Sequence, residues 1–299
     1  MIRGFVCLVT LALFLGPSFL LSHEAALAPR VVPVPKVNTP ADEDDPCIAA
    51  DGLSLFYCSN ATGKQKLMMA WRDKSTQHFT QTRLIDETAS DTNECSPCFI
   101  ENLGDGWDYL YFATQMGSDK SALNYDLYFL RRVAGETRFQ GRSAAAPLHL
   151  VCTPAEEVHP WIVGEGKEMY FSRKTAEGWR VFRATASYRR SFEKVEMLDF
   201  PPGLCHATVS RDSKTMYLQG PVEEGKEKLG LFVSTRKKVK DEWGKPLPLT
   251  MLNTSSGPKG DCSPCLSAKG DYVYFASDRE GGQGGLDLYV VGTKELKVK

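Results

Sequence analysis

The sequence predicts an all-β fold, a five-bladed β-propeller with four antiparallel strands in each blade. Three observations predict it: a segment that recurs five times, a pattern of four short strands in each recurrence, and chain ends that complement each other. The 299 residues are 42% hydrophobic and 24% charged, which is typical of a globular protein. Outside the N-terminal segment, no long stretch has the 3.6-residue period of a helix.

The recurring segment is anchored on a proline in four copies and on an alanine in the fourth. The anchors are Pro46, Pro97, Pro160, Ala207 and Pro264. The spacing is uneven and averages roughly 54 residues, a period that indicates a propeller or a solenoid.

Each copy reads as a series of β-strands. An apolar segment leads into a turn such as Asp51-Gly52 and then into an alternating run such as Leu55-Phe56-Tyr57. A third run ("KLMMAW" in the first copy) and a weaker fourth run follow, and four strands per copy make a propeller blade. The last copy ends after its third run, and residues 30–40 resemble the fourth run of other copies. We therefore expect the N-terminal segment to complete the last blade and leave no open sheet edge.

A glycine-rich stretch, "GGQGG", lies between the second and third strands of the last copy. It lacks the Gly-Lys-Ser/Thr ending of a phosphate loop and the βαβ context of a dinucleotide site, so we interpret it as a hairpin. The pattern of Pro-x-hydrophobic, an Asp/Gly turn, Tyr-Phe-x-Ser and "DREGGQGGLDLYV" is similar to the WD40-like β-propeller repeat of the TolB type. The resemblance covers residues 30–299, is strongest in the fifth copy and weakest in the fourth, and implies the fold but no single activity.

The N-terminus has the pattern of a secretory signal peptide. Arg3 precedes an apolar run over residues 5–21, and small residues follow. We predict a signal peptide over residues 1–28, with an uncleaved anchor as the alternative, and a single propeller domain over 29–299. No other stretch is long and apolar enough for a membrane span. The protein is therefore expected to be exported to the periplasm or the extracellular space, as a monomer.

The charge pattern gives little indication of a partner. The formal net charge is −1, which does not favour nucleic acid. We interpret the acidic run over residues 42–45 as a solvated loop.

Eight cysteines remain after the predicted signal peptide, an even number that predicts disulfides in an oxidising compartment. They are Cys47, Cys58, Cys95, Cys98, Cys152, Cys205, Cys262 and Cys265. Two alternatives stay open: free buried thiols, or a Cys/His metal centre in which Cys47 lies between the Cys-x-x-Cys pairs of the second and fifth copies. The prediction itself includes no metal ion and no cofactor.

The anchors also align polar residues into rings at one mouth of the channel, because the first strand of a blade lines the channel. The candidate ligand-binding residues are Glu43, Asp45, Glu94, Glu157, His159, Trp161, His206 and Asp261. For the acids three positions before an anchor, the alternative is a structural role, capping backbone amides at the start of each blade.

These residues predict an exported, non-catalytic binding or scaffold protein of the bacterial cell envelope, with a protein or glycan as partner at the channel mouth. The alternative is a glycoside hydrolase on the same fold, since "DDPCIAADGLSLFYCS" resembles the first-blade segment of five-bladed propeller glycosidases. In that alternative Asp45 is the base or nucleophile and Glu157 the acid.

Overall fold

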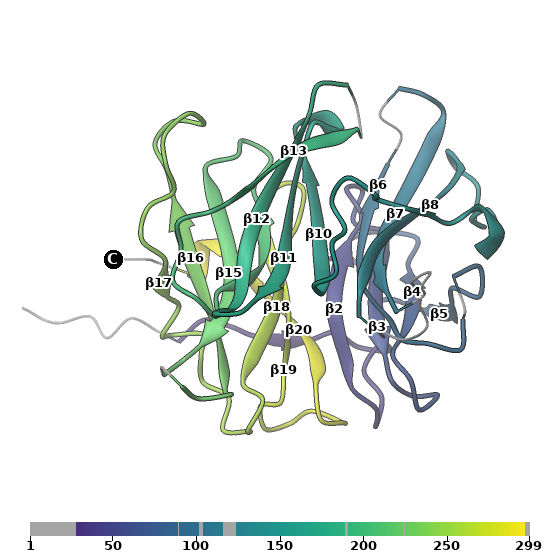
Figure 1. Ribbon diagram of the computed structural model, residues 1–299. Coiled ribbons are helices and arrows are strands. Elements are labelled where there is room, and N and C mark those ends of the chain that lie inside the picture. The colour runs from purple at the N-terminus through teal and green to yellow at the C-terminus, as the bar shows by residue number, and fades with distance from the viewer. Residues whose placement is uncertain are drawn as a thin grey trace, which may run out of the picture.

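The computed structural model describes residues 28–296 except 89, 102–103, 116–123, 189–190 and 224. The predicted signal peptide falls almost wholly on residues 1–27, outside the described residues. Five four-stranded antiparallel sheets are arranged in a ring (Figure 1), which confirms the predicted five-bladed propeller. Among the described residues, no helix has the length and apolarity needed to cross a membrane.

Each blade is a meander in which the first strand is innermost and the fourth outermost. Blade 1 contains β2 (Glu43–Ile48), β3 (Ser54–Ser59), β4 (Lys66–Trp71) and β5 (Gln81–Leu84). Blade 2 contains β6 (Glu94–Ile100), β7 (Trp107–Thr114), β8 (Asp126–Val133) and β9 (Ala146–Pro147). Blade 3 contains β10 (Glu157–Val163), β11 (Glu168–Thr175), β12 (Gly178–Ala186) and β13 (Phe192–Met197). Blade 4 contains β14 (Cys205–Val209), β15 (Thr215–Pro221), β16 (Leu229–Thr235) and β17 (Leu247–Pro248). Blade 5 contains β18 (Asp261–Leu266), β19 (Tyr272–Ser277), β20 (Asp287–Gly292) and β1 (Val32–Pro33).

The ring closes in the predicted way, through β1 on the outside of blade 5. Val32 pairs with Val290 in antiparallel register. The Val34 amide donates to the carbonyl of Leu288 at 2.8 Å, and the Asn38 side chain bonds both the amide and the carbonyl of Leu288. The N-terminal segment therefore completes the last sheet, as the sequence indicates.

The "GGQGG" stretch connects β19 to β20, which confirms the hairpin interpretation. Its glycines allow the loop to pack tightly against the N-terminal segment. A Cβ at Gly284 would lie 1.9 Å from the carbonyl oxygen of Ala41, closer than any side chain can come. The amides of Gln283 and Gly284 donate to Asp287 Oδ2, so Asp287 organises this loop from inside the blade.

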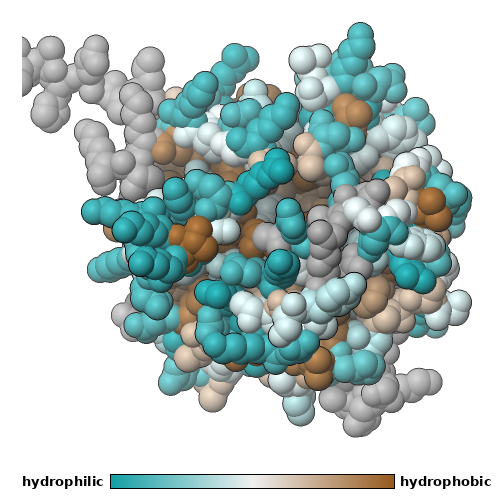
Figure 2. All heavy atoms as spheres, turned by 90° about the horizontal axis from the view of Figure 1, so that it is seen from above, coloured by the Kyte–Doolittle hydropathy of each residue, from teal (hydrophilic) through white to brown (hydrophobic). Residues whose placement is uncertain are grey.

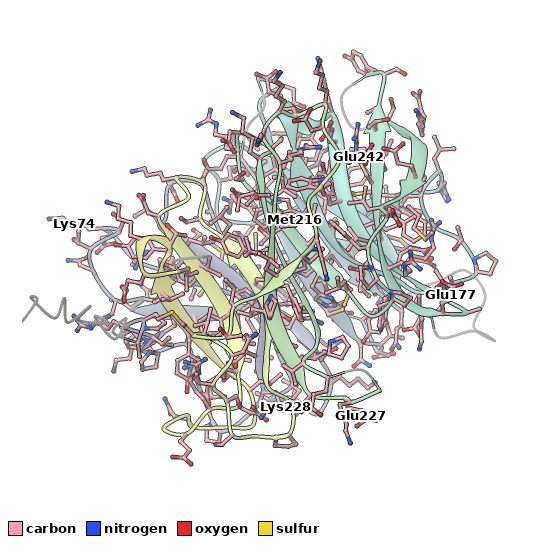
Figure 3. The ribbon with its side chains drawn as sticks, turned by 90° about the vertical axis from the view of Figure 1, so that its left-hand side faces the viewer. Lys74, Glu177, Met216, Glu227, Lys228 and Glu242 are labelled. Carbon is pink, nitrogen blue, oxygen red and sulfur yellow. The ribbon has the colours of Figure 1, made fainter. Side chains whose placement is uncertain are left out.

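Aromatic side chains pack between neighbouring blades. Phe56 of blade 1 stacks on Phe99 of blade 2 with ring centroids 4.5 Å apart. The tyrosine that recurs in every second strand is buried in all five blades, at Tyr57, Tyr111, Tyr170, Tyr217 and Tyr274. Met216, labelled in Figure 3, is likewise fully buried within blade 4. These residues form the core, whereas hydrophilic side chains cover most of the face that Figure 2 shows.

All five innermost strands carry a β-bulge at the same place. The register of each strand breaks just before the anchor, and the residue there has a positive φ of 49 to 54°. The five residues are Asp45, Ser96, His159, His206 and Ser263. A bulge re-aims a side chain, and Asp and His tolerate this backbone region better than β-branched residues do. The bulges thus direct one polar side chain per blade toward the channel.

Candidate active site

The bulge residues from four blades meet in the channel. Asp45 Oδ2 accepts hydrogen bonds from the Ser96 amide at 3.0 Å and from the Ser96 hydroxyl at 2.8 Å. Asp45 Oδ1 lies 3.7 Å from Nε2 of His206. The imidazole rings of His159 and His206 are 4.6 Å apart between centroids. The structure therefore brings together three of the predicted site residues, Asp45, His159 and His206.

Both histidines are held neutral by their surroundings. Burial, and then the neighbouring His206, lower the pKa of His159 to about 3. Burial lowers the pKa of His206 to about 4. His159 Nδ1 and Asp45 Oδ1 are both buried with no hydrogen-bond partner. An unpartnered buried polar atom is costly, so two in one channel mark a place where a ligand or water can bind.

A second carboxyl group lies beside Asp45. Burial, followed by the charge of Asp45, raises the pKa of Asp44 to about 7. Asp44 Oδ1 accepts a hydrogen bond from the Asp45 amide at 2.7 Å. Asp44 is therefore a carboxyl group that keeps its proton to a much higher pH than a free aspartate does, next to a second carboxyl group.

Asp44 and His206 line a cavity of about 360 Å³ at this mouth of the channel. The other polar residues of its wall are Gln219, Glu227, Lys259 and Ser263. Gln219 Oε1 accepts from the Ser263 amide at 2.7 Å, which fixes the side-chain amide against the bulge of blade 5. Glu227 is exposed at the edge of the molecule, next to Lys228 (Figure 3). The cavity thus joins a carboxyl group, an imidazole, an amide and a lysine, the convergent polar groups of a binding site.

The acids three positions before the anchors lie elsewhere, inside the blades. Glu43 is fully buried and accepts hydrogen bonds from the Thr39 amide and from the hydroxyls of Thr39 and Ser59, at 2.7 to 3.0 Å. Asp261 is bonded to Arg279 at 2.6 Å and to the Ser255 amide at 3.2 Å. These contacts are those of the capping role that the sequence left open.

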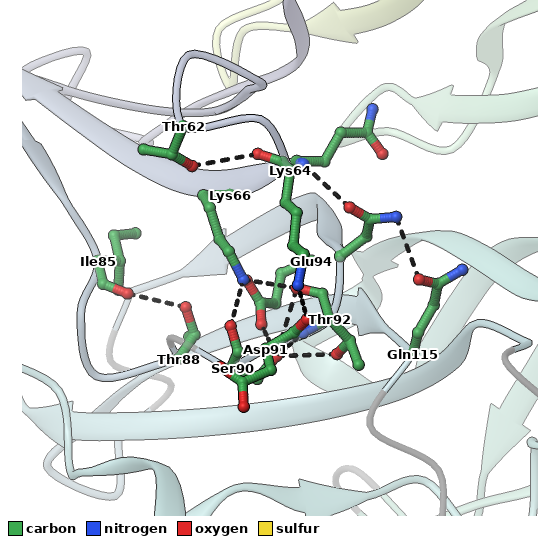
Figure 4. A network of polar contacts seen from close by, with 12 residues as sticks. Thr62, Lys64, Lys66, Ile85, Thr88, Ser90, Asp91, Thr92, Glu94 and Gln115 are labelled. Atoms are coloured by element: carbon green, nitrogen blue, oxygen red, sulfur yellow. Dashed lines mark hydrogen bonds and ion pairs between the residues drawn. The ribbon is translucent and has the colours of Figure 1, made fainter. Parts of the chain in front are cut away.

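Glu94 is likewise engaged inside blade 2, but by side chains rather than by backbone amides. It forms an ion pair with Lys66 at 2.7 Å and accepts from the hydroxyl of Ser90 (Figure 4). Lys66 also donates to the carbonyls of Ser90 and Thr92, and so ties the loop before β6 to blade 1 (Figure 4).

Glu157 is the acid of the predicted Asp45/Glu157 catalytic pair, and the structure does not bring this pair together. Glu157 is fully buried, 2.7 Å from Arg173 Nε, and accepts from Thr153 at 2.6 and 3.2 Å. Its oxygens are engaged within blade 3, whereas Asp45 points into the channel. The catalytic assignment of Glu157 is therefore corrected to a structural one.

Trp161 lies away from the polar mouth. Its indole Nε1 donates to the carbonyl of Val209 at 3.0 Å, and its ring lines a second cavity of about 410 Å³. Asp44 and His206 are not part of that cavity wall. Trp161, a candidate ligand-binding residue of the polar mouth in the sequence, is thus part of the wall of the other, largely apolar mouth.

The cysteines do not pair in the structure. All eight are free, and seven of them are buried. Seven of them lie on the first or second strand of a blade, and Cys152 lies in the loop before β10. The predicted disulfides are therefore not shown.

One further group of potential metal ligands, Asp126, Cys152 and Glu157, has its ligand atoms within 4.8 Å of one another. Its members already satisfy each other and their neighbours. Glu157 is paired with Arg173, and the Cys152 thiol bonds both Asp126 and the backbone of Leu127. We therefore interpret this group as a structural contact between blades 2 and 3.

Sequence reasoning missed Asp44, Gln219 and Lys259. The acidic run over residues 42–45 was interpreted as a solvated loop, yet Glu43 is fully buried and Asp45 is 5% exposed. One signal was available in the sequence. Two positions before the anchor, three of the other blades have a cysteine, whereas blade 1 has Asp44.

No protein-family model matches the chain, and no curated protein matches it in sequence. Solved structures do match its fold. An α-L-arabinofuranosidase from Lactobacillus brevis is 13% identical over 87% of this chain and 94% of its own, with a TM-score of 0.57. An α-L-arabinofuranosidase from Podospora anserina, solved with cellotriose, is 11% identical over 88% and 94%, with a TM-score of 0.55. TolB from Acinetobacter baumannii is 15% identical over 88% of this chain and 55% of its own, with a TM-score of 0.49.

These comparisons correct the predicted function. A WD40-like repeat is not shown. The two arabinofuranosidases, an arabinanase and a xylosidase/arabinofuranosidase are each covered over 94% of their own length. The prediction of a non-catalytic scaffold is therefore contradicted, and the glycoside hydrolase alternative is better supported. At 10 to 13% identity such likeness shows the fold alone, so an activity has to be argued from the residues.

Proposed function

We propose that the protein is a glycoside hydrolase whose reacting carboxyl groups are Asp44 and Asp45. The observation that carries the proposal is geometric: Asp44 lines the cavity at the channel mouth and accepts a hydrogen bond from the amide of Asp45, the next carboxyl group along the chain. Glycosidases use two carboxyl groups, one that keeps its proton to release the leaving group and one that acts as base or nucleophile. An environment that keeps one carboxyl of a pair protonated at neutral pH supports such a division of roles.

In this proposal Asp44 is the general acid, because it lines the cavity and retains its proton near neutrality. Asp45 is the base or nucleophile. Two hydrogen bonds from Ser96 hold one of its oxygens, which leaves Oδ1 unpartnered and facing His206. The neutral His206 ring at the cavity wall supplies a hydrogen-bond partner for a sugar hydroxyl.

The substrate class is a short glycan that presents one sugar to the cavity. A cavity of about 360 Å³ is at the small end of ligand pockets, which suits removal of a single terminal sugar. Pentose substrates are the first to try, because the solved structures of similar fold are named as arabinofuranosidases and a xylosidase. Export by the N-terminal segment, which we predict, would place the enzyme where such glycans occur.

The test compares substrates that differ in their need for acid assistance. The chain is assayed on arabino- and xylo-oligosaccharides and on 4-nitrophenyl pentosides, whose leaving group needs little protonation. We expect Asp44→Asn to lower kcat on oligosaccharides by about 10²- to 10⁴-fold while retaining far more activity on the nitrophenyl substrates. We expect Asp45→Asn to lose both activities, and wild-type kcat on oligosaccharides to fall above about pH 7, where Asp44 loses its proton.

The control is Asp86→Asn, which removes a surface ion pair with Arg138 at 3.2 Å that involves no residue of the cavity wall. This variant should keep its kcat within a few-fold. Absence of turnover on every substrate by the folded wild-type chain, or equal activity of all three variants, would overturn the proposal.

A further inference from the structure

Three cysteines lie on the innermost strands of three neighbouring blades, each one residue after its anchor proline. Cys47, Cys98 and Cys265 hold the same position in blades 1, 2 and 5, and each is 1 to 2% exposed. The Cys47 thiol is hydrogen-bonded to both Cys265 and Cys98. The sequence alternative that placed Cys47 between the two Cys-x-x-Cys pairs thus matches the geometry.

A backbone N–H group points at each of the three sulfurs. The Phe99 amide donates to Cys47 Sγ at 3.3 Å, and the Ile48 amide donates to Cys265 Sγ at 3.4 Å. The Ile162 amide bonds Cys98. Each sulfur therefore accepts an N–H from the next blade around the ring.

The cluster opens onto the apolar mouth of the channel. Cys47 and Cys98 are part of the wall of the 410 Å³ cavity, together with Ile48, Phe99 and Trp161. An ion or small complex that enters this mouth therefore meets the sulfurs of Cys47 and Cys98, and Cys265 lies behind them as the hydrogen-bond partner of Cys47. The charged residues of this cavity wall are Glu101, Glu165 and Arg211.

We propose that Cys47, Cys98 and Cys265 form a binding site for a soft monovalent metal ion, Cu(I), at the base of the apolar cavity. Thiolates in a dry apolar setting select soft ions, and Cu(I) is the biological ion of this kind. Structural zinc normally takes four ligands, and in blades 3 and 4 the matching positions hold Trp161 and Thr208, which are not zinc ligands. A three-sulfur site therefore fits Cu(I) better than Zn²⁺.

The three sulfurs do not yet lie within 4.8 Å of one another. A bound ion would draw Cys98 and Cys265 toward Cys47, and bridge blades 1, 2 and 5. A coordinated sulfur is also shielded from oxidation in the oxidising compartment to which we predict export. The site lies past the anchors, whereas Asp44 and Asp45 lie before them, so it is independent of the proposed glycosidase.

The experiment titrates the reduced full chain with Cu(I) under anaerobic conditions, against the chromogenic chelator bathocuproine disulfonate. We expect one Cu(I) per chain, and only sulfur ligands in X-ray absorption spectra of the complex. A parallel titration with Zn²⁺ should show much weaker binding. Cys47→Ser should abolish binding at chelator concentrations that the wild type withstands, and Cys98→Ser and Cys265→Ser should weaken it.

The matched control is Cys58→Ser, which removes a thiol that is equally buried, in the same blade, but placed beside Asp45 at the other end of the channel. It should bind Cu(I) as the wild type does. Retention of Cu(I) by Cys47→Ser, equal loss in Cys58→Ser, or nitrogen and oxygen ligands in the wild-type spectra would overturn the site. The spectra need no variant, so they decide the question even if a serine variant folds poorly.

Discussion

At the scale of single residues, position in the blade decides what a carboxylate does. Glu43 and Asp45 are two residues apart, yet one is enclosed by donors within its blade and the other faces the channel. The bulge makes the difference, because it turns the side chain at the position before the anchor toward the axis. Burial alone is therefore a poor guide to function here, since both residues are at most 5% exposed.

We predict that Glu157→Gln mainly affects stability. The change leaves Arg173 with an uncharged partner at a buried site, and breaking a buried pair costs about 2–4 kcal/mol of the free energy of unfolding. Urea unfolding monitored by fluorescence measures this loss. The activity per folded molecule should not change, because Glu157 does not reach the channel.

The neighbouring Glu156→Gln is the control for that variant. Glu156 pairs with Lys174 at 2.8 Å on the surface, where an ion pair contributes about 1 kcal/mol or less. A large stability loss in Glu156→Gln, or a loss of turnover in Glu157→Gln at full folding, would contradict the capping role.

The sequence pointed to Asp45 and the two histidines because the anchors align them in one ring at a mouth of the channel. It did not point to Asp44, since its raised pKa depends on burial and on the charge of Asp45. Neither can be read from an acidic run, which usually indicates a solvated loop. The same limit applies to Gln219 and Lys259, which reach the cavity from blades 4 and 5.

At the scale of elements, the strands and their order were predictable because each blade repeats the same hydrophobic pattern and turn residues. Closure was predictable because the last copy lacks a fourth strand and the N-terminus supplies one. The bulges were not predictable, since Asp, Ser and His at the same position have no shared preference strong enough to indicate a positive φ. That single backbone feature decides which ring of residues faces the channel.

We predict that deleting Val31 to Thr39 lowers the melting temperature by roughly 10 °C or more. The deletion removes β1 and exposes the edge of β20, and it also removes Val34 and Val37, which are 2% and 1% exposed. Burying one such side chain contributes about 1.5–3 kcal/mol. Calorimetry of the deletion, beside a chain that lacks only residues 1–27, measures the effect. Equal melting temperatures would contradict closure through β1.

At the scale of the whole molecule, the ring gathers titratable groups from several blades into one buried channel. Asp44 and Asp45 come from blade 1, His159 from blade 3 and His206 from blade 4. Because the blades form one closed ring, the protonation of these groups is linked to global unfolding. The pH dependence of stability therefore reports on the channel as a unit.

Acidification changes the free energy of unfolding in opposite directions through the two histidines and through Asp44. The folded pKa values of His159 and His206, about 3 and about 4, lie below the unfolded value of 6.5. Their contribution is fully present above about pH 6.5 and is lost as the pH falls toward 4. The folded pKa of Asp44, about 7, lies above its unfolded value of 3.8, so its contribution is present at low pH and is lost as the pH rises toward 7.

We predict that the histidines dominate below neutrality, because two of them oppose one aspartate. As the pH falls from 6.5 to about 5, each histidine should lower the free energy of unfolding by about 2 kcal/mol. Over the same range, Asp44 should raise it by a similar amount. The wild type should thus lose stability on acidification in urea unfolding curves. The double variant His159→Asn/His206→Asn should instead gain stability as the pH falls, through Asp44, and Asp44→Asn should show a steeper acid loss than the wild type. Parallel pH profiles for all three proteins would show that the channel groups are not buried together as the structure places them.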